Sequence, residues 1–177
     1  MKNLVRMKLK AQEVVTGPFV GINSPDLVEI IGLAGFDLCV PRALSYGLRP
    51  LGEALEEANR EVMVIVHCEN ITGLERIDEI AAVDGVDMVF VGPYDLSQSL
   101  GVPGEIFHPS MVKAVSRALE AIKRAGKPAG IFVTSPEEAE RRIGEGFRYI
   151  GYSVDGLIFG KACREIVSTL KSRRQGT

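Results

Sequence analysis

The stretch VFVGPYDLSQSLG, residues 89–101, decides the fold of this chain. It begins as a continuous apolar run, which is typical of a strand that is buried on both faces. The run stops at Gly92-Pro93, an ordinary strand terminator, and Tyr94 and Asp95 follow at once. A carboxylate at the mouth of a buried strand therefore calls for an explanation.

Strand and helix patterns alternate on both sides of this stretch. Short apolar runs predict six strands, at residues 17–22, 36–40, 62–69, 87–92, 128–133 and 147–154. Amphipathic segments predict helices at residues 25 to about 35, 51–61, 71–83, 109–124, 136–143 and 157–171. Ser24 is the expected N-cap of the first helix, and Ser135 and Glu138 have capping-box spacing. This alternation with short connections predicts an α/β fold with a parallel sheet.

Glycine patterns narrow the choice among parallel α/β folds. Neither Gly-x-Gly-x-x-Gly nor Gly-x-x-x-x-Gly-Lys-Ser/Thr occurs at the expected place, which argues against a nucleotide-binding doubly wound sheet. In a closed parallel barrel the functional groups lie at the carboxyl ends of the strands. In this chain too, polar residues such as Asp95 come directly after predicted strands.

Composition and charge exclude several classes of protein. The chain has 177 residues, enough for one domain, 1–177, with a core. The net charge of −2 and the lack of a basic face exclude a nucleic-acid binder, and KSRRQ at 171–175 indicates a solvated helix end. No apolar run reaches the ~18 residues of a membrane span, and the N-terminus has no apolar signal-peptide core. Cys39, Cys68 and Cys163 lie apart in apolar runs, which predicts buried free thiols in a cytoplasmic protein.

Two carboxylates follow neighbouring strands of the predicted sheet. Glu69 closes the strand 62–69, and Asp95 follows the strand 87–92. Because parallel strands lie about 4.8 Å apart, both carboxylates could approach one cation. Oxygen ligands of this kind suit Mg²⁺ or Mn²⁺, with water and substrate completing the octahedron. The alternative is that Glu69 is an ordinary helix N-terminal acid favoured by the helix dipole.

Histidine and backbone groups complete the candidate site. Since strand side chains alternate, His67 shares a face with Glu69 and would face the barrel mouth with it. A hydrogen-bonded core histidine is the alternative. Gly92 would let the backbone approach a ligand, and the amides of Tyr94 and Asp95 could open a helix and hold a carboxylate. His108 is predicted to be a helix-entry residue without a chemical role.

Segments spread along the chain resemble the metal-dependent pyruvate aldolases of the HpcH/HpaI type, such as 4-hydroxy-2-oxoheptanedioate and 2-dehydro-3-deoxyglucarate aldolases. These segments are NSPDLVEIIGLAGFD (23–37), RALSYG (42–47), the strand ending in Glu69, VDGVDMVFVGPYDLSQSLG (83–101), HPSMVKAV (108–115) and YSVDGLIF (152–159). They occur in the family's order, and the GPxDLS element is specific. The resemblance implies a TIM-barrel-like fold and a carbon–carbon lyase that releases pyruvate and an aldehyde.

The resemblance also implies roles for individual residues. Glu69 and Asp95 match the family's ligands of a divalent cation, Mg²⁺ or Mn²⁺. Pyruvate would chelate this cation, and its carboxylate would meet the backbone amides of Tyr94 and Asp95. The family has a substrate-contacting glutamine where this chain has His67, which could serve as a makeshift base. Asp95 would then be a metal ligand at the mouth of a barrel strand.

One departure from the family pattern concerns the segment after Val40. There the family continues into an Asp-x-Glu-His element that supplies its general base, and a later unit carries an arginine that contacts pyruvate. Here Val40 runs directly into Pro41-Arg42, and Arg42 matches a different loop arginine. A complete barrel takes about 250 residues and this chain has 177, so an internal deletion reducing it to about six strand–helix units is predicted.

The departure leaves two hypotheses about function. One is a class II pyruvate aldolase with a reduced barrel, acting on 4-hydroxy-2-oxo acids. The other is a non-catalytic relative that binds metal and a 2-oxo acid but lacks the family's base and arginine. Unpaired strand edges and exposed apolar faces predict a homo-oligomer in either case. Exchange of the last helix, 157–171, is the expected route, because the resemblance implies such swapping.

Overall fold

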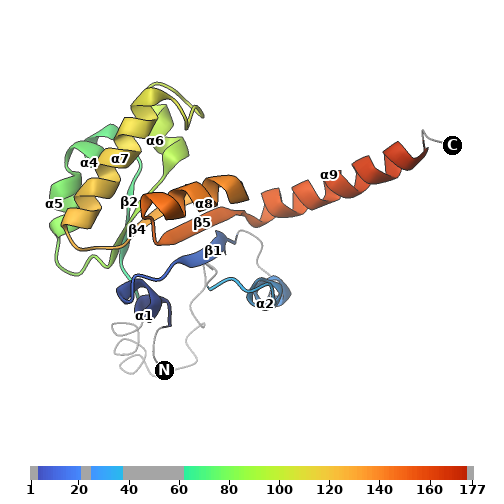
Figure 1. The fold of residues 1–177 in the computed structure, drawn as a ribbon, viewed down its shortest axis with the longest axis horizontal. Coiled ribbons are helices and arrows are strands. Elements are labelled where there is room, and N and C mark those ends of the chain that lie inside the picture. The colour runs from blue at the N-terminus through green and yellow to red at the C-terminus, as the bar shows by residue number, and fades with distance from the viewer. Residues whose placement is uncertain (1–3, 21–24, 38–61, 175–177) are drawn as a thin grey trace.

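The computed structural model describes residues 4–20, 25–37 and 62–174 of the chain. Their strands form one parallel sheet in the order β1-β5-β4-β3-β2 (Figure 1). The strands are β1 (Val15–Phe19), β2 (Ile65–Cys68), β3 (Met88–Val91), β4 (Ala129–Val133) and β5 (Tyr149–Val154). This confirms the predicted α/β class with parallel strands. Among the described residues, β1 and β2 are the two edges of the sheet and no pairing joins them.

The described helices are α1 (Leu4–Lys10), α2 (Pro25–Leu33), α4 (Ile71–Glu75), α5 (Ile77–Ala82), α6 (Pro93–Ser99), α7 (Pro109–Arg124), α8 (Pro136–Glu145) and α9 (Asp155–Arg174). The expected single helix over 71–83 is wrong, because Arg76 leaves helical geometry (φ −101°, ψ 17°) and separates α4 from α5. The predicted N-cap Ser24, most of the predicted strand 36–40 and the helix 51–61 lie outside the described residues.

The first strand begins two residues earlier than the sequence pattern predicts. The N–H of Val15 donates to the carbonyl of Arg148 at 2.7 Å, so pairing with β5 starts there. Helix α1, which the sequence analysis did not predict, precedes this strand and packs Leu9 into the core. An ion pair between Arg6 and Asp87 ties α1 to the start of β3. Helix α1 therefore closes the amino-terminal end of the sheet's inner face.

Two apolar layers cover the two faces of the sheet. On the outer face, Val89, Val91 and Ile131 pack against helices α4, α5 and α7. Figure 1 shows these helices together on one side of the curved sheet. On the inner face, Met88 and Phe90 pack with residues of β1 and β5. Since β3 is buried on both sides, its continuous apolar sequence is explained by this double covering.

Phe90 occupies the centre of the inner face, and two glycines make room for it. A Cβ atom on Gly130 would lie 2.6 Å from the Phe90 ring, and one on Gly151 would lie 2.9 Å from it. Neither position tolerates a side chain without displacement of the ring. The Phe90 ring also meets the Phe19 ring edge-on, with centroids 5.8 Å apart, and its centroid lies 5.1 Å from that of the His67 ring. An aromatic floor thus lies beneath the carboxyl ends of the strands.

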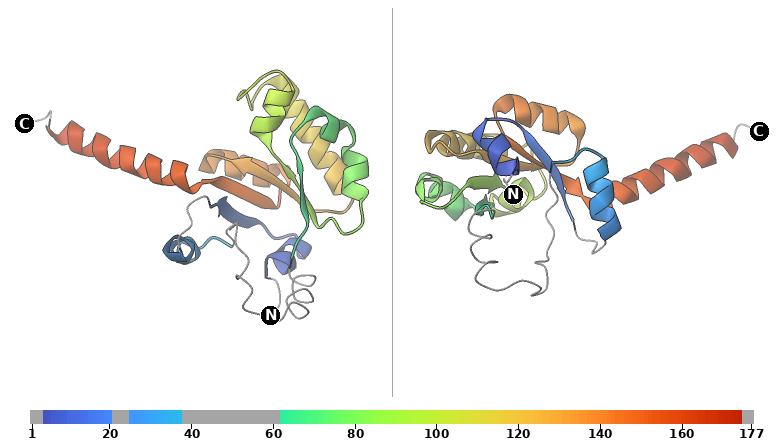
Figure 2. Two further views of the ribbon diagram at one scale, coloured as in Figure 1. Left: turned by 180° about the vertical axis from the view of Figure 1, so that it is seen from behind. Right: turned by 90° about the horizontal axis from the view of Figure 1, so that it is seen from below.

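Helix α9 runs away from the sheet as a single rod, which both views in Figure 2 make clear. Its large apolar side chains are exposed, among them Phe159, Ile166 and Leu170. Cys163 on this helix is also exposed, so the prediction that it is buried is wrong, whereas Cys68 is buried as predicted. No helix in the described ranges is long and apolar enough to cross a membrane.

Candidate functional site

Glu69 and Asp95 lie at the same edge of the sheet. Strands β2 and β3 are parallel neighbours in which Cys68 is opposite Val91. The backbone N–H of Gly92 continues this ladder and donates to the carbonyl of Cys68 at 3.2 Å. Glu69 follows β2 directly, and Asp95 is in the first turn of α6. The sequence prediction that both carboxylates occupy neighbouring strand mouths therefore agrees with the described geometry.

The space above Gly92 is shared by both carboxylates. A Cβ atom built on Gly92 would lie 3.2 Å from Oε2 of Glu69 and 3.6 Å from Oδ2 of Asp95. It would also lie 3.1 Å from the Cβ of Glu69. The two oxygens thus flank one small volume, which stays open because residue 92 has no side chain. A cation in or near that volume would have two carboxylate oxygens within reach.

His67 joins this group from the inner face of the sheet. Its Nδ1 lies 3.3 Å from Oε2 of Glu69, and its ring lies against Phe90. Both side chains are a little under half exposed. Because a carboxylate only accepts hydrogen bonds, Nδ1–H is the donor in the neutral imidazole, and Nε2 carries the lone pair. His67 is therefore not a buried core histidine, and its ring lies on the inner face of the sheet.

Glu69 and His108 were both expected near the start of a helix, and the caps of α4 and α7 show where each lies. Asn70, not Glu69, is the N-cap of α4, and its side chain accepts from the N–H of Gly73 at 2.8 Å. Glu69 directly precedes this N-cap, so its carboxylate lies next to the N-terminus of α4, as the alternative role also expects. His108 is the N-cap of α7, and its Nδ1 accepts from the N–H of Ser110. The prediction that His108 is a helix-entry residue is confirmed.

The donor set around Gly92 fits a hard divalent cation. Within the described ranges there is no group of three His, Cys, Asp or Glu side chains that could hold a metal ion by itself. Two carboxylates nevertheless match the way Mg²⁺ is bound, with few protein ligands and the remaining positions left to water and substrate. The neighbouring Cys68 side chain packs in the apolar layer on the outer face of the sheet, where burial, with the nearby Glu69 charge, raises the pKa of its thiol to about 11.

A cavity of about 660 Å³ is lined in part by Tyr94, the residue before Asp95. The Tyr94 ring meets the ring of Phe132 edge-on, with centroids 5.9 Å apart. The cavity is lined by Tyr94, Gly104, Glu105, Ile106, Phe107, His108, Pro109, Thr134, Ser135 and Glu138. Sequence reasoning missed it, because its walls come from the loop before α7 and the start of α8. Neither segment carries a chemical motif.

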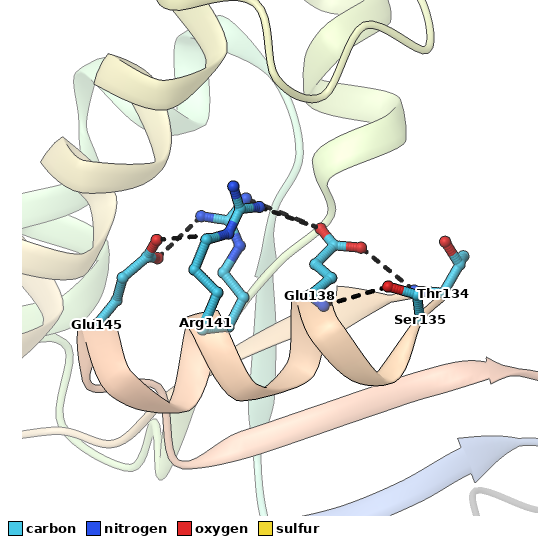
Figure 3. A network of polar contacts seen from close by, with 6 residues as sticks. Thr134, Ser135, Glu138, Arg141 and Glu145 are labelled. Atoms are coloured by element: carbon cyan, nitrogen blue, oxygen red, sulfur yellow. Dashed lines mark hydrogen bonds and ion pairs between the residues drawn. The ribbon is translucent and has the colours of Figure 1, made fainter.

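The start of α8 is held by its own polar groups, as Figure 3 shows. The N–H of Glu138 donates to Oγ of Ser135 at 3.2 Å, as the capping-box prediction requires. The returning bond differs from the prediction, because Oε2 of Glu138 accepts from the N–H of Thr134 instead of that of Ser135. The guanidinium of Arg141 lies 3.9 Å from Oε1 of Glu138 and packs over the Phe107 ring. The cap thus binds one first-turn amide of α8, that of Glu138.

Comparison with known proteins identifies the family. The model of the HpcH/HpaI aldolase/citrate lyase family matches residues 41–162, well over half of the chain. The chain therefore belongs to this family. The match begins directly after Val40, and the deletion expected at that point stays a prediction.

Curated relatives carry aldolase names. A 2-keto-3-deoxy-L-rhamnonate aldolase of Klebsiella pneumoniae subsp. pneumoniae is 34% identical over 142 residues, which are 80% of this chain and 52% of the relative. A hydroxypyruvate/pyruvate aldolase of Cupriavidus necator is 32% identical with the same coverage. The chain thus spans about half the length of the curated relatives it matches.

Solved structures of the family share the fold. An HpcH/HpaI aldolase/citrate lyase family protein from Burkholderia cenocepacia J2315 superposes with a TM-score of 0.83 at 23% identity, over 96% of this chain and 100% of that one. An HpcH/HpaI aldolase from Desulfitobacterium hafniense DCB-2 gives a TM-score of 0.81 at 20% identity, over 94% and 96%. The TIM-barrel-like class is therefore confirmed, although the sheet of the described residues is open between β1 and β2.

Proposed function

We propose that residues 1–177 form a single, incomplete β/α-barrel domain that acts as a divalent-metal-dependent pyruvate aldolase. This carbon–carbon lyase would cleave a 4-hydroxy-2-oxo acid into pyruvate and an aldehyde. The observation that supports it most is the convergence of Glu69 and Asp95 over Gly92, in a chain of the HpcH/HpaI family. The names of the relatives, a rhamnonate-type and a pyruvate aldolase, favour the same reaction class.

Glu69 and Asp95 are the residues that would hold the cation, Mg²⁺ or Mn²⁺. When bound, the cation supplies Lewis acidity next to the keto oxygen of the 2-oxo acid. The carboxylates fix its position from two elements, the end of β2 and the first turn of α6. Gly92 contributes by its lack of a side chain, since a Cβ there would press on Oε2 of Glu69.

The backbone of α6 is suited to orient the substrate. First-turn amides of a helix have no acceptor within the helix, so the N–H groups of Tyr94 and Asp95 are available to a carboxylate. Pro93 at the first helical position fixes the direction of this turn. The carboxylate of pyruvate would lie against these two amides. The reacting carbons would then point across the mouth toward His67.

His67 is the proposed proton acceptor. Its Nδ1–H is held by Glu69, which leaves the Nε2 lone pair to take the proton of the substrate's 4-hydroxyl group as the carbon–carbon bond breaks. The aromatic floor formed by Phe90 limits water beneath this point. The same histidine also occupies the place of the family's substrate-contacting glutamine.

An aldol assay tests the proposal directly. The full chain is incubated with pyruvate and glyceraldehyde, with Mn²⁺, with Mg²⁺, or with a chelator, and the product is measured by chromatography. The proposal expects product that depends on the metal and is lost in Glu69→Gln. Metal binding without any product would favour the non-catalytic relative, and product that persists in chelator would refute a metal-dependent reaction.

A further inference from the structure

We propose that Ser99 is a positioning residue, which holds helix α6, and with it Asp95, in a fixed place relative to Glu69. This inference rests on the proposed metal-dependent aldolase and deepens it, because it names what sets the geometry of the carboxylate pair before a cation binds. The observation behind it is one hydrogen bond, in which the N–H of Ile71 donates to Oγ of Ser99 at 3.0 Å. The two residues are 28 positions apart in the sequence, and each follows one of the two carboxylates.

Helix α6 presents Asp95 and Ser99 from the same side. The two residues are four positions apart in Pro93–Ser99, and side chains at that spacing are neighbours on one face of a helix. Oδ2 of Asp95 borders the volume above Gly92. Ser99 lies one turn further along and reaches the N–H of Ile71. The face of α6 that would supply a metal ligand is therefore also the face that is tied to the segment after β2.

Ile71 passes the effect of this hydrogen bond to Glu69 through the intervening Asn70. Ile71 is the first residue of α4, and the N–H of a first helical residue has no acceptor within its own helix. Oγ of Ser99 supplies that acceptor. A helix of five residues has little stability of its own. What binds the start of α4 therefore fixes the direction in which the chain leaves β2, and with it the backbone of Glu69.

Two hydrogen bonds join the end of β2 to the segment that follows β3. At the strand ends, the N–H of Gly92 donates to the carbonyl of Cys68 at 3.2 Å. At the far end of α6, Ser99 accepts from Ile71. In each of the two segments, the carboxylate lies between these two points of attachment. One attachment would let α6 turn about its start, whereas two attachments a helix length apart fix its direction.

The size of the effect on metal binding follows from linkage. A hydrogen bond that favours the arrangement ready for metal can raise metal affinity by no more than its own net contribution, a factor of about five. Ser99 is half-buried and Ile71 is exposed, so this bond is not a core contact. Its loss should therefore change the position of the carboxylates more than the integrity of the fold.

Calorimetric titration of the full chain with Mn²⁺ tests the inference. We expect Ser99→Ala to bind Mn²⁺ about fivefold more weakly than the wild type, and Ser99→Thr, which keeps a hydroxyl acceptor, to stay within a factor of about two. Ser135→Ala is the matched control, because Oγ of Ser135 also accepts from a first-turn amide, but on α8. It should lose a comparable amount of resistance to urea and bind Mn²⁺ like the wild type.

Two results of this titration would overturn the inference and leave the aldolase function intact. One is Mn²⁺ affinity of Ser99→Ala equal to that of the wild type. The other is equal weakening in Ser99→Ala and Ser135→Ala, since general stability, and not the link to Ile71, would then set the affinity.

Amide hydrogen exchange of the metal-free chain gives a result that does not depend on the metal. Ser99→Ala should speed exchange of the Ile71 amide at least about fivefold and that of the Gly92 amide in the same direction, whereas Ser135→Ala should change neither. A wild-type chain that binds no Mn²⁺ would refute the proposed function. Faster exchange at both amides in Ser99→Ala would still support the role of Ser99 in holding α6, and wild-type exchange at both would overturn it.

Discussion

Nδ1 of His67 lies 3.3 Å from Oε2 of Glu69. The contact follows from strand geometry, because residues two apart on a strand point to the same face. It ties a proton-carrying group to a candidate metal ligand at the same strand end. The orientation of His67 is thus set by a residue that the proposed chemistry also needs.

Replacing His67 by glutamine tests whether this residue accepts a proton or only contacts the substrate. His67→Gln keeps a side-chain donor for Glu69 and restores the residue type that the resembled family has, but it removes the proton acceptor. We expect kcat in the aldol assay to fall about 10²-fold, the usual loss for a general base. Mn²⁺ affinity should stay within a factor of about two, since Glu69 and Asp95 remain. An unchanged kcat would show that His67 does not accept the proton.

Adding a methyl group at residue 92 tests the shared volume between the carboxylates. Gly92→Ala places a Cβ 3.2 Å from Oε2 of Glu69 and 3.1 Å from its Cβ. We expect Mn²⁺ affinity to drop at least about tenfold, because displaced ligands bind metal less well. Gly144→Ala is the control, since a Cβ there meets nothing within 4 Å. Equal Mn²⁺ affinity of Gly92→Ala and the wild type would show that the volume above Gly92 is not part of a metal site.

The close approach of Gly130 to the Phe90 ring on the inner face of the sheet predicts how a substitution there changes the free energy of unfolding. Gly130→Ala would bring a Cβ to 2.6 Å from the Phe90 ring, and such overpacking costs about 1–3 kcal/mol of the free energy of unfolding. Urea denaturation measures this loss. In a double-mutant cycle, Phe90→Leu should recover part of it, because the smaller side chain vacates the space. Strictly additive effects of the two changes would contradict the close approach.

The sequence predicted the fold class and the placement of the carboxylates for physical reasons. Apolar runs such as MVFV at 88–91 are typical of strands buried on both sides, and parallel strands bring their carboxyl ends together. Glu69 and Asp95 could therefore be placed at one edge. The break at Arg76 was missed, because the apolar periodicity of 71–83 continues across it.

Other features depend on contacts that periodicity does not encode. Helix α1 is short and carries scattered charges, and its place is set by the ion pairs of Arg6 with Asp87 and of Lys8 with Asp37. The cavity is formed by loop residues such as Phe107 and by a capping residue, Glu138, whose pattern signals only a helix start. Cys163 lies in an apolar pattern, yet it is exposed because α9 leaves the sheet.

The exposed apolar side chains of helix α9 lead us to predict that the chain self-associates. Phe159, Ile166 and Leu170 are exposed and fall on one face at helical spacing. We expect sedimentation to show a dimer or larger species in which α9 packs on a second copy. The double change Phe159→Lys and Ile166→Lys should shift the chain to monomer, whereas Ser168→Lys on the opposite face should not. A wild-type monomer that is stable to dilution from micromolar concentration would contradict this account.

The central claim is that Glu69 and Asp95 together hold a divalent cation, and calorimetric titration with Mn²⁺ tests it most directly. The wild-type chain should bind one Mn²⁺ per chain, and Asp95→Ala should abolish the binding while its circular dichroism spectrum stays unchanged. Asp84→Ala, which removes a carboxylate from the turn before β3, should bind like the wild type. Equal Mn²⁺ binding by Asp95→Ala and the wild type would contradict the claim.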